Sequence, residues 1–371
     1  MTISQRRDRL RQRLKSDGLD AMLVTRLVNV RYLSGFTGSN AALLIRADDD
    51  TPVLATDGRY RTQAAAQVPD VEIVIERACG PFLTGRAAAD GARRLGFESH
   101  VVTVDGFDAL TKVACDTELV RAAGTVEALR EVKDAGEVAL LRLACEAADA
   151  ALADLVQGGG LRPGRTEREV GRELESLMLD HGADGVSFET IVATGANSAI
   201  PHHRPTDAVL AAGDFVKIDF GALVCGYHSD MTRTFVLAPA AQWQLDLYEL
   251  VAASQRAGRE AVKPGVALRD VDAASRRVIA DAGYADKFTH GLGHGVGLEI
   301  HEAPGISASA AGTLLSGSAV TVEPGVYLPD RGGVRIEDTL VVCEAPVEPD
   351  GRRHQTSELL TRFPRELAIL S

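Results

Sequence analysis

The sequence is poor in several features that mark other classes of protein. It has 1 tryptophan in 371 residues, and aromatic residues make up 5% of it. Its 5 cysteines are scattered and lack CxxC spacing, which argues against a disulfide framework and favours reduced thiols. No apolar run approaches the ~20 residues of a membrane span, and no signal-peptide core follows the charged N-terminus. We therefore expect a cytoplasmic protein.

Charge and length set further bounds. With 40 basic and 52 acidic residues, the formal net charge of −12 argues against nucleic acid as the main partner and favours solubility. The hydrophobic fraction of 45% is ordinary for a globular protein. A chain of 371 residues exceeds one ordinary core, so we expect two domains.

The first part of the chain alternates helix-like and strand-like segments. A charged helix is expected over 4–18, and short apolar segments follow as candidate strands at 21–25, 29–36, 41–45, 52–56, 71–75 and 101–105. This pattern predicts a small α/β domain over 1–128. The region contains neither a Gly-rich phosphate loop after a strand nor a metal-like cluster. We expect Tyr32, Phe36 and segment 57–60 to serve packing and turns.

The rest of the chain, 129–371, repeats itself. A helix is expected over 137–156, with apolar positions at Val138, Leu141, Leu143, Leu152 and Leu155. The Pro-Gly pair of segment 161–164 recurs in 262–265 at an offset of 101 residues (264 − 163). A capping box at 166–169 predicts the start of the helix that follows the first copy. Each half then reads helix, helix, strand, loop, strand.

The repeat pairs four acids. Asp219 matches Glu323 at an offset of 104 residues (323 − 219), and Asp230 matches Glu337 at 107 (337 − 230). Singly, each acid is better explained as a solvated strand end. A pseudo-twofold packing of the halves would instead bring all four together, with His294 as a fifth group. Because such a cluster repels itself, the pattern favours a site for divalent cations.

A histidine- and glycine-rich stretch, 288–304, supplies that fifth group. His290, His294 and His301 fall within twelve residues, separated partly by glycines. Each glycine costs a helix about 1 kcal/mol relative to alanine, so we expect extended chain in which backbone approaches closely.

These motifs jointly resemble the pita-bread metallopeptidases, in the aminopeptidase P/prolidase branch. The matching segments are Asn-Val-Arg-Tyr-Leu-Ser-Gly-Phe at 29–36, Ile-Asp-Phe-Gly at 218–221, Ser-Asp-Met-Thr-Arg-Thr at 229–234, Gly-Leu-Gly-His-Gly at 291–295, Val-Glu-Pro-Gly-Val-Tyr at 322–327 and Arg-Ile-Glu-Asp at 335–338. The resemblance implies an α/β (α+β) protein, with a creatinase-like N-terminal domain and a pita-bread catalytic domain containing a pseudo-twofold repeat.

The resemblance also implies a dinuclear metal site. Asp219 would bind one ion, His294 and Glu323 the other, and Asp230 and Glu337 would bridge both. We expect two divalent ions per subunit, with Mn²⁺ as the first choice and Co²⁺, Zn²⁺ or Fe²⁺ as alternatives. Paired ions of this kind activate water and polarise the scissile carbonyl.

Further roles follow from the same resemblance. His202 and His301 match the two histidines that bind substrate and the tetrahedral intermediate, and Glu323 is the candidate proton shuttle. The resemblance places Thr232 and Arg335 beside ligands, where they would orient the carboxylates, and His290 and Arg335 at the substrate. Phe188 and Tyr327 would either wall the proline pocket or pack in the core. His203 and His228 are expected to be surface or core polar residues.

The implied activity is hydrolysis of the Xaa-Pro bond, with release of the residue before proline. Some prolidases carry an arginine after the His-Glu-x-Pro segment to bind a dipeptide's carboxylate, whereas this chain has Gly305. The choice between dipeptides and longer peptides therefore stays open. The resemblance further implies a homodimer, and neither nucleic acid nor membrane is expected as a partner.

Three alternatives remain. A creatinase-like amidinohydrolase shares the fold but lacks the metal ligands, all five of which are present here. A methionine aminopeptidase usually lacks the large N-terminal domain. A catalytically silent peptide-binding module would bind metal without turnover, and activity measurements would distinguish it.

Overall fold

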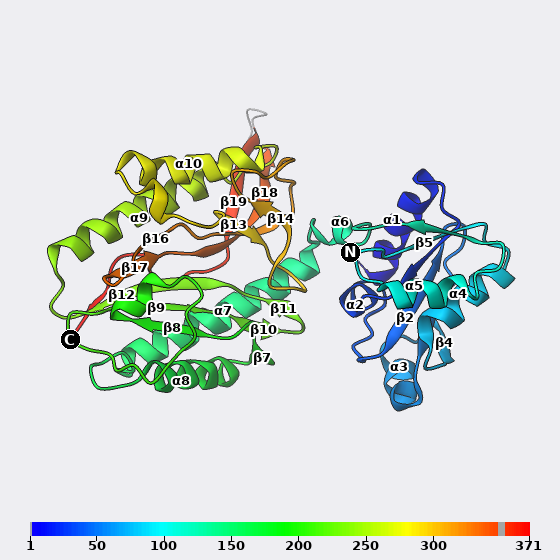
Figure 1. Ribbon diagram of the computed structural model, residues 1–371, viewed down its shortest axis with the longest axis horizontal. Coiled ribbons are helices and arrows are strands. Elements are labelled where there is room, and N and C mark those ends of the chain that lie inside the picture. The colour runs from blue at the N-terminus through cyan, green and yellow to red at the C-terminus, as the bar shows by residue number, and fades with distance from the viewer. Residues whose placement is uncertain (1, 348–352) are drawn as a thin grey trace. The chain divides into compact units, whose positions relative to one another are not determined.

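The computed structural model describes residues 2–347 and 353–371 (Figure 1). The chain divides into two compact units, Met1–Arg130 and Glu131–Ser371. The boundary predicted near residue 128 lies close to this division. All five cysteines are free thiols. In the described part of the chain, none of the helices combines the length and the apolar character needed to cross a membrane.

The first unit is built on a six-stranded mixed sheet. Its strands, in spatial order, are β4 (Glu72–Ile75), β3 (Val53–Thr56), β2 (Ala41–Arg46), β1 (Ala21–Val24), β5 (Arg94–Phe97) and β6 (Glu118–Arg121). The helices of the unit are α1 (Ile3–Ser16), α2 (Leu27–Ser34), η1 (Gly58–Tyr60), α3 (Arg61–Gln67), α4 (Cys79–Ala89), α5 (Val104–Thr111) and α6 (Glu127–Arg130). The predicted α/β domain is thus observed, and Tyr32 and Phe36 are buried in it, as expected.

Two strand predictions in this unit were wrong. Residues 29–36 lie mostly in helix α2, where Val30 and Leu33 are buried one turn apart and Gly35, at φ 87°, ends the helix. Residues 101–105 run into helix α5, because the Thr103 side chain accepts from the backbone N–H of Gly106 and caps that helix. Strands β5 and β6 occupy the places in the sheet instead.

The second unit has four long helices and two principal sheets. The helices are α7 (Ala135–Gln157), α8 (Glu167–Asp180), α9 (Gln242–Ala261) and α10 (Leu268–Asp281), with short 3₁₀ turns η2 (Gly195–Ala199) and η3 (Ala285–Lys287). In Figure 1 the pairs α7/α8 and α9/α10 lie on opposite sides of the strands. The predicted helix over 137–156 is confirmed, but Leu143 is 51% exposed because it lies about 200° around the helix from buried Leu141.

The two principal sheets have four and five strands and share a matching central pair. One has the order β20 (Ile369–Leu370), β12 (Met231–Leu237), β9 (Phe215–Phe220), β8 (Ile191–Thr194), and the other β14 (Glu302–Ile306), β13 (Gly293–Gly295), β15 (Ala319–Val322), β18 (Asp338–Val347), β19 (Arg353–Leu359). Smaller sheets consist of β11 (Tyr227–His228), β10 (Ala222–Val224) and β7 (Gly185–Val186), and of β16 (Gly325–Leu328) and β17 (Gly332–Arg335).

The internal repeat predicted from the sequence is confirmed. Helices α8 and α10 begin at residues 167 and 268 and end at 180 and 281, an offset of 101 at both ends (268 − 167 and 281 − 180). The capping box at Thr166 and Glu169 is also present. The adjacent pair β9/β12 in one sheet matches β15/β18 in the other. The acids predicted to be equivalent therefore lie at corresponding positions in the two copies of the structural repeat.

Candidate metal centre

Two acids come from the first copy of the repeat. Asp219 lies in β9, where it pairs in register with Thr232 of the antiparallel strand β12. Asp230 comes one residue before β12 begins. Both are largely buried, at 7% and 4% exposure. The strand pairing therefore places both acids near the same end of the β9/β12 ladder.

His294 comes from a strand that only glycines permit. A Cβ on Gly293 would lie 2.0 Å from the carbonyl oxygen of Thr321, and one on Gly295 would lie 2.1 Å from that of Ala303. The predicted close backbone approach is thus present, and the neighbouring strands hold β13 between them. The His294 Nδ1 lies 3.0 Å from the Gly295 carbonyl oxygen, which leaves Nε2 for the site.

The second copy supplies two more acids. Glu323 follows β15 directly, and Glu337 comes one residue before β18. The Glu337 backbone N–H donates to the Thr232 carbonyl at 3.1 Å, and Thr339 Oγ1 donates to the Asp230 carbonyl at 2.8 Å. These bonds tie the two copies together at the ligand positions.

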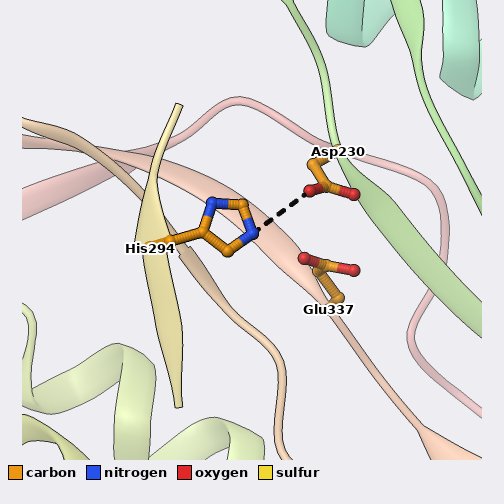
Figure 2. Close-up of side chains that lie close together, drawn as sticks. All are labelled: Asp230, His294 and Glu337. Carbon is orange, nitrogen blue, oxygen red and sulfur yellow. Dashed lines mark ion pairs between the residues drawn. The ribbon is translucent and has the colours of Figure 1, made fainter. Parts of the chain in front are cut away.

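The ligand side chains converge at this junction (Figure 2). Ligand atoms of Asp230, His294 and Glu337 all lie within 4.8 Å of one another. His294 Nε2 is 3.5 Å from Asp230 Oδ2 and 3.5 Å from Glu323 Oε1. Glu337 Oε1 and Asp219 Oδ1 are buried without a hydrogen-bond partner.

Such oxygens are costly to bury unless a cation binds them, so the donor set fits a divalent metal.

The electrostatics of the cluster agree with this interpretation. Burial raises the pKa of Glu323 to about 8, with Asp219 adding to the rise and Arg335 opposing it. Burial and neighbouring acids also raise the pKa values of Asp230 and Glu337 well above their ordinary values. Burial lowers the pKa of His294 to about 4, so the ring is neutral and able to donate a lone pair. A cation would reverse the rise of the acids' pKa values.

Two polar residues orient the acids. The Arg335 guanidinium, 1% exposed, donates to Asp219 through Nη2 and to Thr232 Oγ1 through Nε at 3.0 Å. Thr232 Oγ1 in turn donates to Glu337 Oε2 at 2.6 Å. A continuous chain of hydrogen bonds therefore runs from an acid of one copy to an acid of the other.

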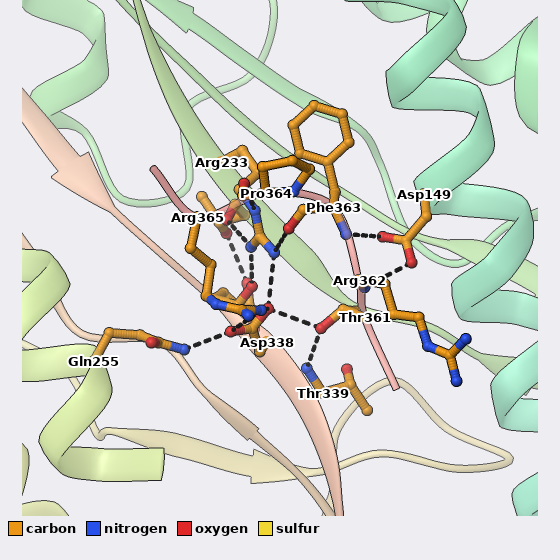
Figure 3. Close-up of polar contacts among 12 residues, drawn as sticks. Asp149, Arg233, Gln255, Asp338, Thr339, Thr361, Arg362, Phe363, Pro364 and Arg365 are labelled. Atoms are coloured by element: carbon orange, nitrogen blue, oxygen red, sulfur yellow. Dashed lines mark hydrogen bonds and ion pairs between the residues drawn. The ribbon is translucent and has the colours of Figure 1, made fainter. Parts of the chain in front are cut away.

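A second network is centred on Asp338, the residue that follows Glu337 in the chain (Figure 3). Asp338 accepts from Arg233 Nη2 at 2.8 Å, Gln255 Nε2 at 2.6 Å and Thr361 Oγ1 at 2.9 Å. Burial raises the pKa of Asp338, but Arg233 and Arg365 outweigh that effect and lower it. Because Arg233 belongs to β12 and Asp338 to β18, this ion pair joins the two repeat copies beside the ligands.

A cavity of about 250 Å³ opens onto all five predicted ligands. Its other lining residues are Phe188, Glu189, Ile191, His202, His203, Arg204, Ile300 and His301. The ring of His301 packs edge-on against that of His294 with centroids 4.4 Å apart. His202 and His301 are exposed, and Phe188 is half-buried. The structure thus brings both predicted substrate histidines and Phe188 to one cavity.

His290 and Tyr327 lie elsewhere. Neither is among the described residues that line this cavity. His290 Nε2 is 2.9 Å from Tyr327 Oη, and Tyr327 Oη accepts from Arg335 Nη1 at 2.9 Å. Burial raises the pKa of Tyr327 to about 12 and lowers that of His290 to about 4. Both residues therefore support Arg335 from behind.

Several residues around the site escaped sequence reasoning. Lys217 is fully buried and donates to the carbonyls of Ile200 at 2.6 Å and Pro201 at 3.3 Å, directly before His202. Glu167, also fully buried, lies 2.8 Å from His203 Nε2.

The one sequence feature that could have indicated them is their position: Lys217 interrupts an apolar strand, and Glu167 begins an amphipathic helix. His203, expected to be a core or surface polar residue, has a side chain that is 9% exposed, and it also lines the cavity.

Comparison with known proteins agrees with this geometry. The model of metallopeptidase family M24 matches residues 139–344, and that of the creatinase/prolidase N-terminal domain matches 6–132. The uncharacterized peptidase YqhT of Bacillus subtilis is 40% identical over 98% of this chain and 99% of its own. The Xaa-Pro dipeptidase of Bacillus anthracis is similar in structure, with a TM-score of 0.90, 37% identity and full coverage of both chains.

The X-Pro aminopeptidase of Thermotoga maritima is also similar, with a TM-score of 0.85 and 33% identity over 95% of this chain and 98% of its own. The chain belongs to metallopeptidase family M24, with a creatinase/prolidase N-terminal domain.

Proposed function

We propose that this protein hydrolyses the Xaa-Pro peptide bond and releases the residue before proline. The observation that carries the proposal is the cavity in which His202 and His301 face the junction of four acids and His294. The similar structures from Bacillus anthracis and Thermotoga maritima, an Xaa-Pro dipeptidase and an X-Pro aminopeptidase, support the substrate class.

The ligand set proposed here comprises Asp219, Asp230, His294, Glu323 and Glu337. Their oxygen-rich chemistry, with one imidazole, suits Mn²⁺ first and Co²⁺, Zn²⁺ or Fe²⁺ next, and we propose two ions per subunit. Bound divalent ions supply Lewis-acid polarisation of the scissile carbonyl and activation of water. We also propose a cytoplasmic homodimer.

Glu323 is suited to move the proton. Its side chain borders the cavity. A carboxylate at this position can accept a proton from water and pass it on to the leaving group. The leaving group is the secondary amine of proline, which must gain a proton as the bond breaks.

His202 and His301 would hold the peptide. Burial, with Arg335 adding to it, lowers the pKa of His202, so its ring is neutral at pH 7 and can donate or accept a hydrogen bond. Because the Xaa-Pro bond has no amide N–H, the enzyme can position it through hydrogen bonds to the carbonyl oxygens of the peptide. Phe188, Ile191 and Ile300 supply the apolar part of the cavity wall.

The test begins with enzyme stripped of metal and supplied again with Mn²⁺, Co²⁺ or Zn²⁺. Release of proline from an Xaa-Pro dipeptide is compared with release of the first residue from an Xaa-Pro tripeptide. Turnover of either substrate supports the proposal, and the preferred length separates a prolidase from an aminopeptidase P. Bound metal with neither activity would overturn it in favour of the peptide-binding module.

A further inference from the structure

One ion pair at the metal-site cavity has no part in the proposed chemistry. Arg204 Nη2 lies 3.1 Å from Glu189 Oε2, and their side chains are 82% and 60% exposed. Both residues line the cavity. Exposed pairs of this kind are worth at most about 1 kcal/mol, so another carboxylate can replace Glu189 at little cost.

The charge of the cavity makes Arg204 stand out. Five of its lining residues are acids, and Arg204 is the one lysine or arginine among the described residues that line it. Under the proposed function four of these acids bind metal, so Arg204 remains as the arginine of this lining that can pair with the free C-terminal carboxylate of a peptide. The guanidinium offers two parallel N–H donors, which match the two oxygens of a carboxylate.

The chain around Arg204 is fixed while its guanidinium is free to move. His203, its neighbour, lies 2.8 Å from buried Glu167 through Nε2. Upstream, Lys217 holds the Ile200 carbonyl at 2.6 Å. Downstream, the Thr206 backbone N–H donates to Glu167 Oε2 at 2.8 Å. The backbone around Arg204 is therefore anchored on both sides, and only the exposed end of the arginine needs to change partner.

Strand β14 offers no competing cation. Gly305 has no side chain, and a Cβ built on it would meet nothing within 4 Å. It lines a different cavity, together with Pro304 and Ala310, and is not among the residues that line the metal-site cavity.

We propose that Arg204 is a specificity-determining residue: it binds the free carboxylate of Xaa-Pro dipeptides, and Glu189 holds it in place until substrate arrives. This inference rests on the proposed function and names its substrate class as the peptide with a free carboxylate next to the scissile bond. Arg204 acts in binding and takes no part in the bond-breaking step.

The experiment compares Ala-Pro with its C-terminal amide, Ala-Pro-NH₂, which has the same scissile bond but no terminal charge. We expect the wild-type protein to cleave Ala-Pro with a kcat/KM about tenfold higher. Arg204→Gln should lower kcat/KM for Ala-Pro about tenfold, mainly through KM, and leave the amide unchanged. Arg204→Lys should restore part of the preference. Glu189→Gln should raise kcat/KM for Ala-Pro, because it removes the competing carboxylate.

Arg168→Gln is the matched control, since Arg168 is another exposed arginine, paired with Asp207 at 2.6 Å, and does not line the cavity. This variant should leave kcat/KM unchanged for both substrates. Raising the salt concentration should reduce the wild-type preference and leave that of Arg204→Gln as it is.

Three results would overturn the inference: equal cleavage of acid and amide by the wild-type protein, an unchanged ratio in Arg204→Gln, or equal losses on both substrates. Failure of the proposed function looks different, since metal-loaded wild-type protein would then cleave neither peptide.

Discussion

Asp230 is buried among groups of its own charge. Its carboxylate lies 3.5 Å from the neutral His294 ring, and burial and Glu337 raise its pKa far above the ordinary value. In the metal-free protein, burial and the neighbouring acids favour the protonated, neutral form of Asp230, which avoids the cost of burying a carboxylate charge. A bound cation neutralises the cluster in a different way, by pairing with the ionised acids.

Asp230→Asn is therefore expected to separate stability from metal binding. The amide resembles the protonated acid in size and charge. The free energies of unfolding of the metal-free variant and the metal-free wild type should therefore differ by no more than about 1 kcal/mol. The variant should lose both the stabilisation that added Mn²⁺ confers and the peptidase activity. Thermal unfolding with and without Mn²⁺ measures this, with the exposed Asp207→Asn as control. Turnover by Asp230→Asn would remove Asp230 from the ligand set.

The His301→Ala variant is expected to retain its bound metal but to have a lower kcat. Its ring packs on His294 but is exposed, so truncation leaves the ligand in place. Loss of a hydrogen bond to the transition state costs a factor of about 10² or more. Metal content and kcat report the two effects separately, and His181→Ala, a partly exposed histidine paired with Asp154, serves as control. Unchanged kinetics would remove His301 from the substrate site.

At the scale of elements, strand β9 carries two functions on one face. Side chains alternate along a strand, so Lys217 and Asp219 point the same way. Lys217 holds the carbonyls before His202, while Asp219 is a predicted metal ligand. One rigid strand thus sets the position of the substrate histidine relative to the metal centre.

Lys217→Met should consequently loosen His202 without removing metal. Methionine keeps the apolar packing of the side chain but leaves two carbonyls with weaker partners, although Arg335 Nη1 still donates to Pro201 at 3.1 Å. We expect kcat/KM to fall about tenfold, of the size that one hydrogen bond contributes. The fall should be smaller in a His202→Ala background, which double-mutant kinetics can measure. Equal losses in both backgrounds would contradict the positioning role.

At the scale of the molecule, the proposed metal centre belongs to neither repeat copy alone. Asp219 and Asp230 come from the first copy, and His294, Glu323 and Glu337 come from the second. The ion pair of Arg233 with Asp338 fastens the copies beside the ligands. Correct folding of both copies is therefore a condition for binding metal.

The first unit has a partly buried carboxylate, Glu127, whose side chain is 17% exposed. Burial raises its pKa, but hydrogen bonds from Asn29, His100 and Arg26 outweigh that effect and lower the pKa to about 2. A lowered pKa contributes stability that is present above the unfolded value, near 4.5, and is lost as pH falls towards 2.

Glu127→Gln should accordingly flatten the acid dependence of stability. Denaturant unfolding of the first unit at pH 6 and pH 3 should show a smaller difference in the variant than in the wild type. Glu118→Gln provides the control, because Glu118 is 66% exposed and pairs with Arg94 at the surface. The same pH dependence in Glu127→Gln and wild type would show that other groups govern acid unfolding.

The sequence by itself determined the repeat and the helix that begins with the capping box at 166–169, and it predicted the acids and histidine of the proposed metal centre. These features can be recognised without knowledge of long-range contacts. A capping box involves residues three positions apart, and the two copies of a repeat can be aligned by the order of their motifs. Helix α2 was mistaken for a strand because a short apolar run fits either period until neighbours are known.

Only the tertiary structure decided which polar residues face the cavity. Arg204 and Glu189 are 15 residues apart (204 − 189) and carry no motif, yet the fold brings them together at the cavity. Tyr327 and His290 belong to matching motifs, yet they lie behind Arg335 rather than among the lining residues. The direction of these side chains depends on how strands from the two repeat copies pack against each other. The spacing of residues along the chain does not predict that long-range packing.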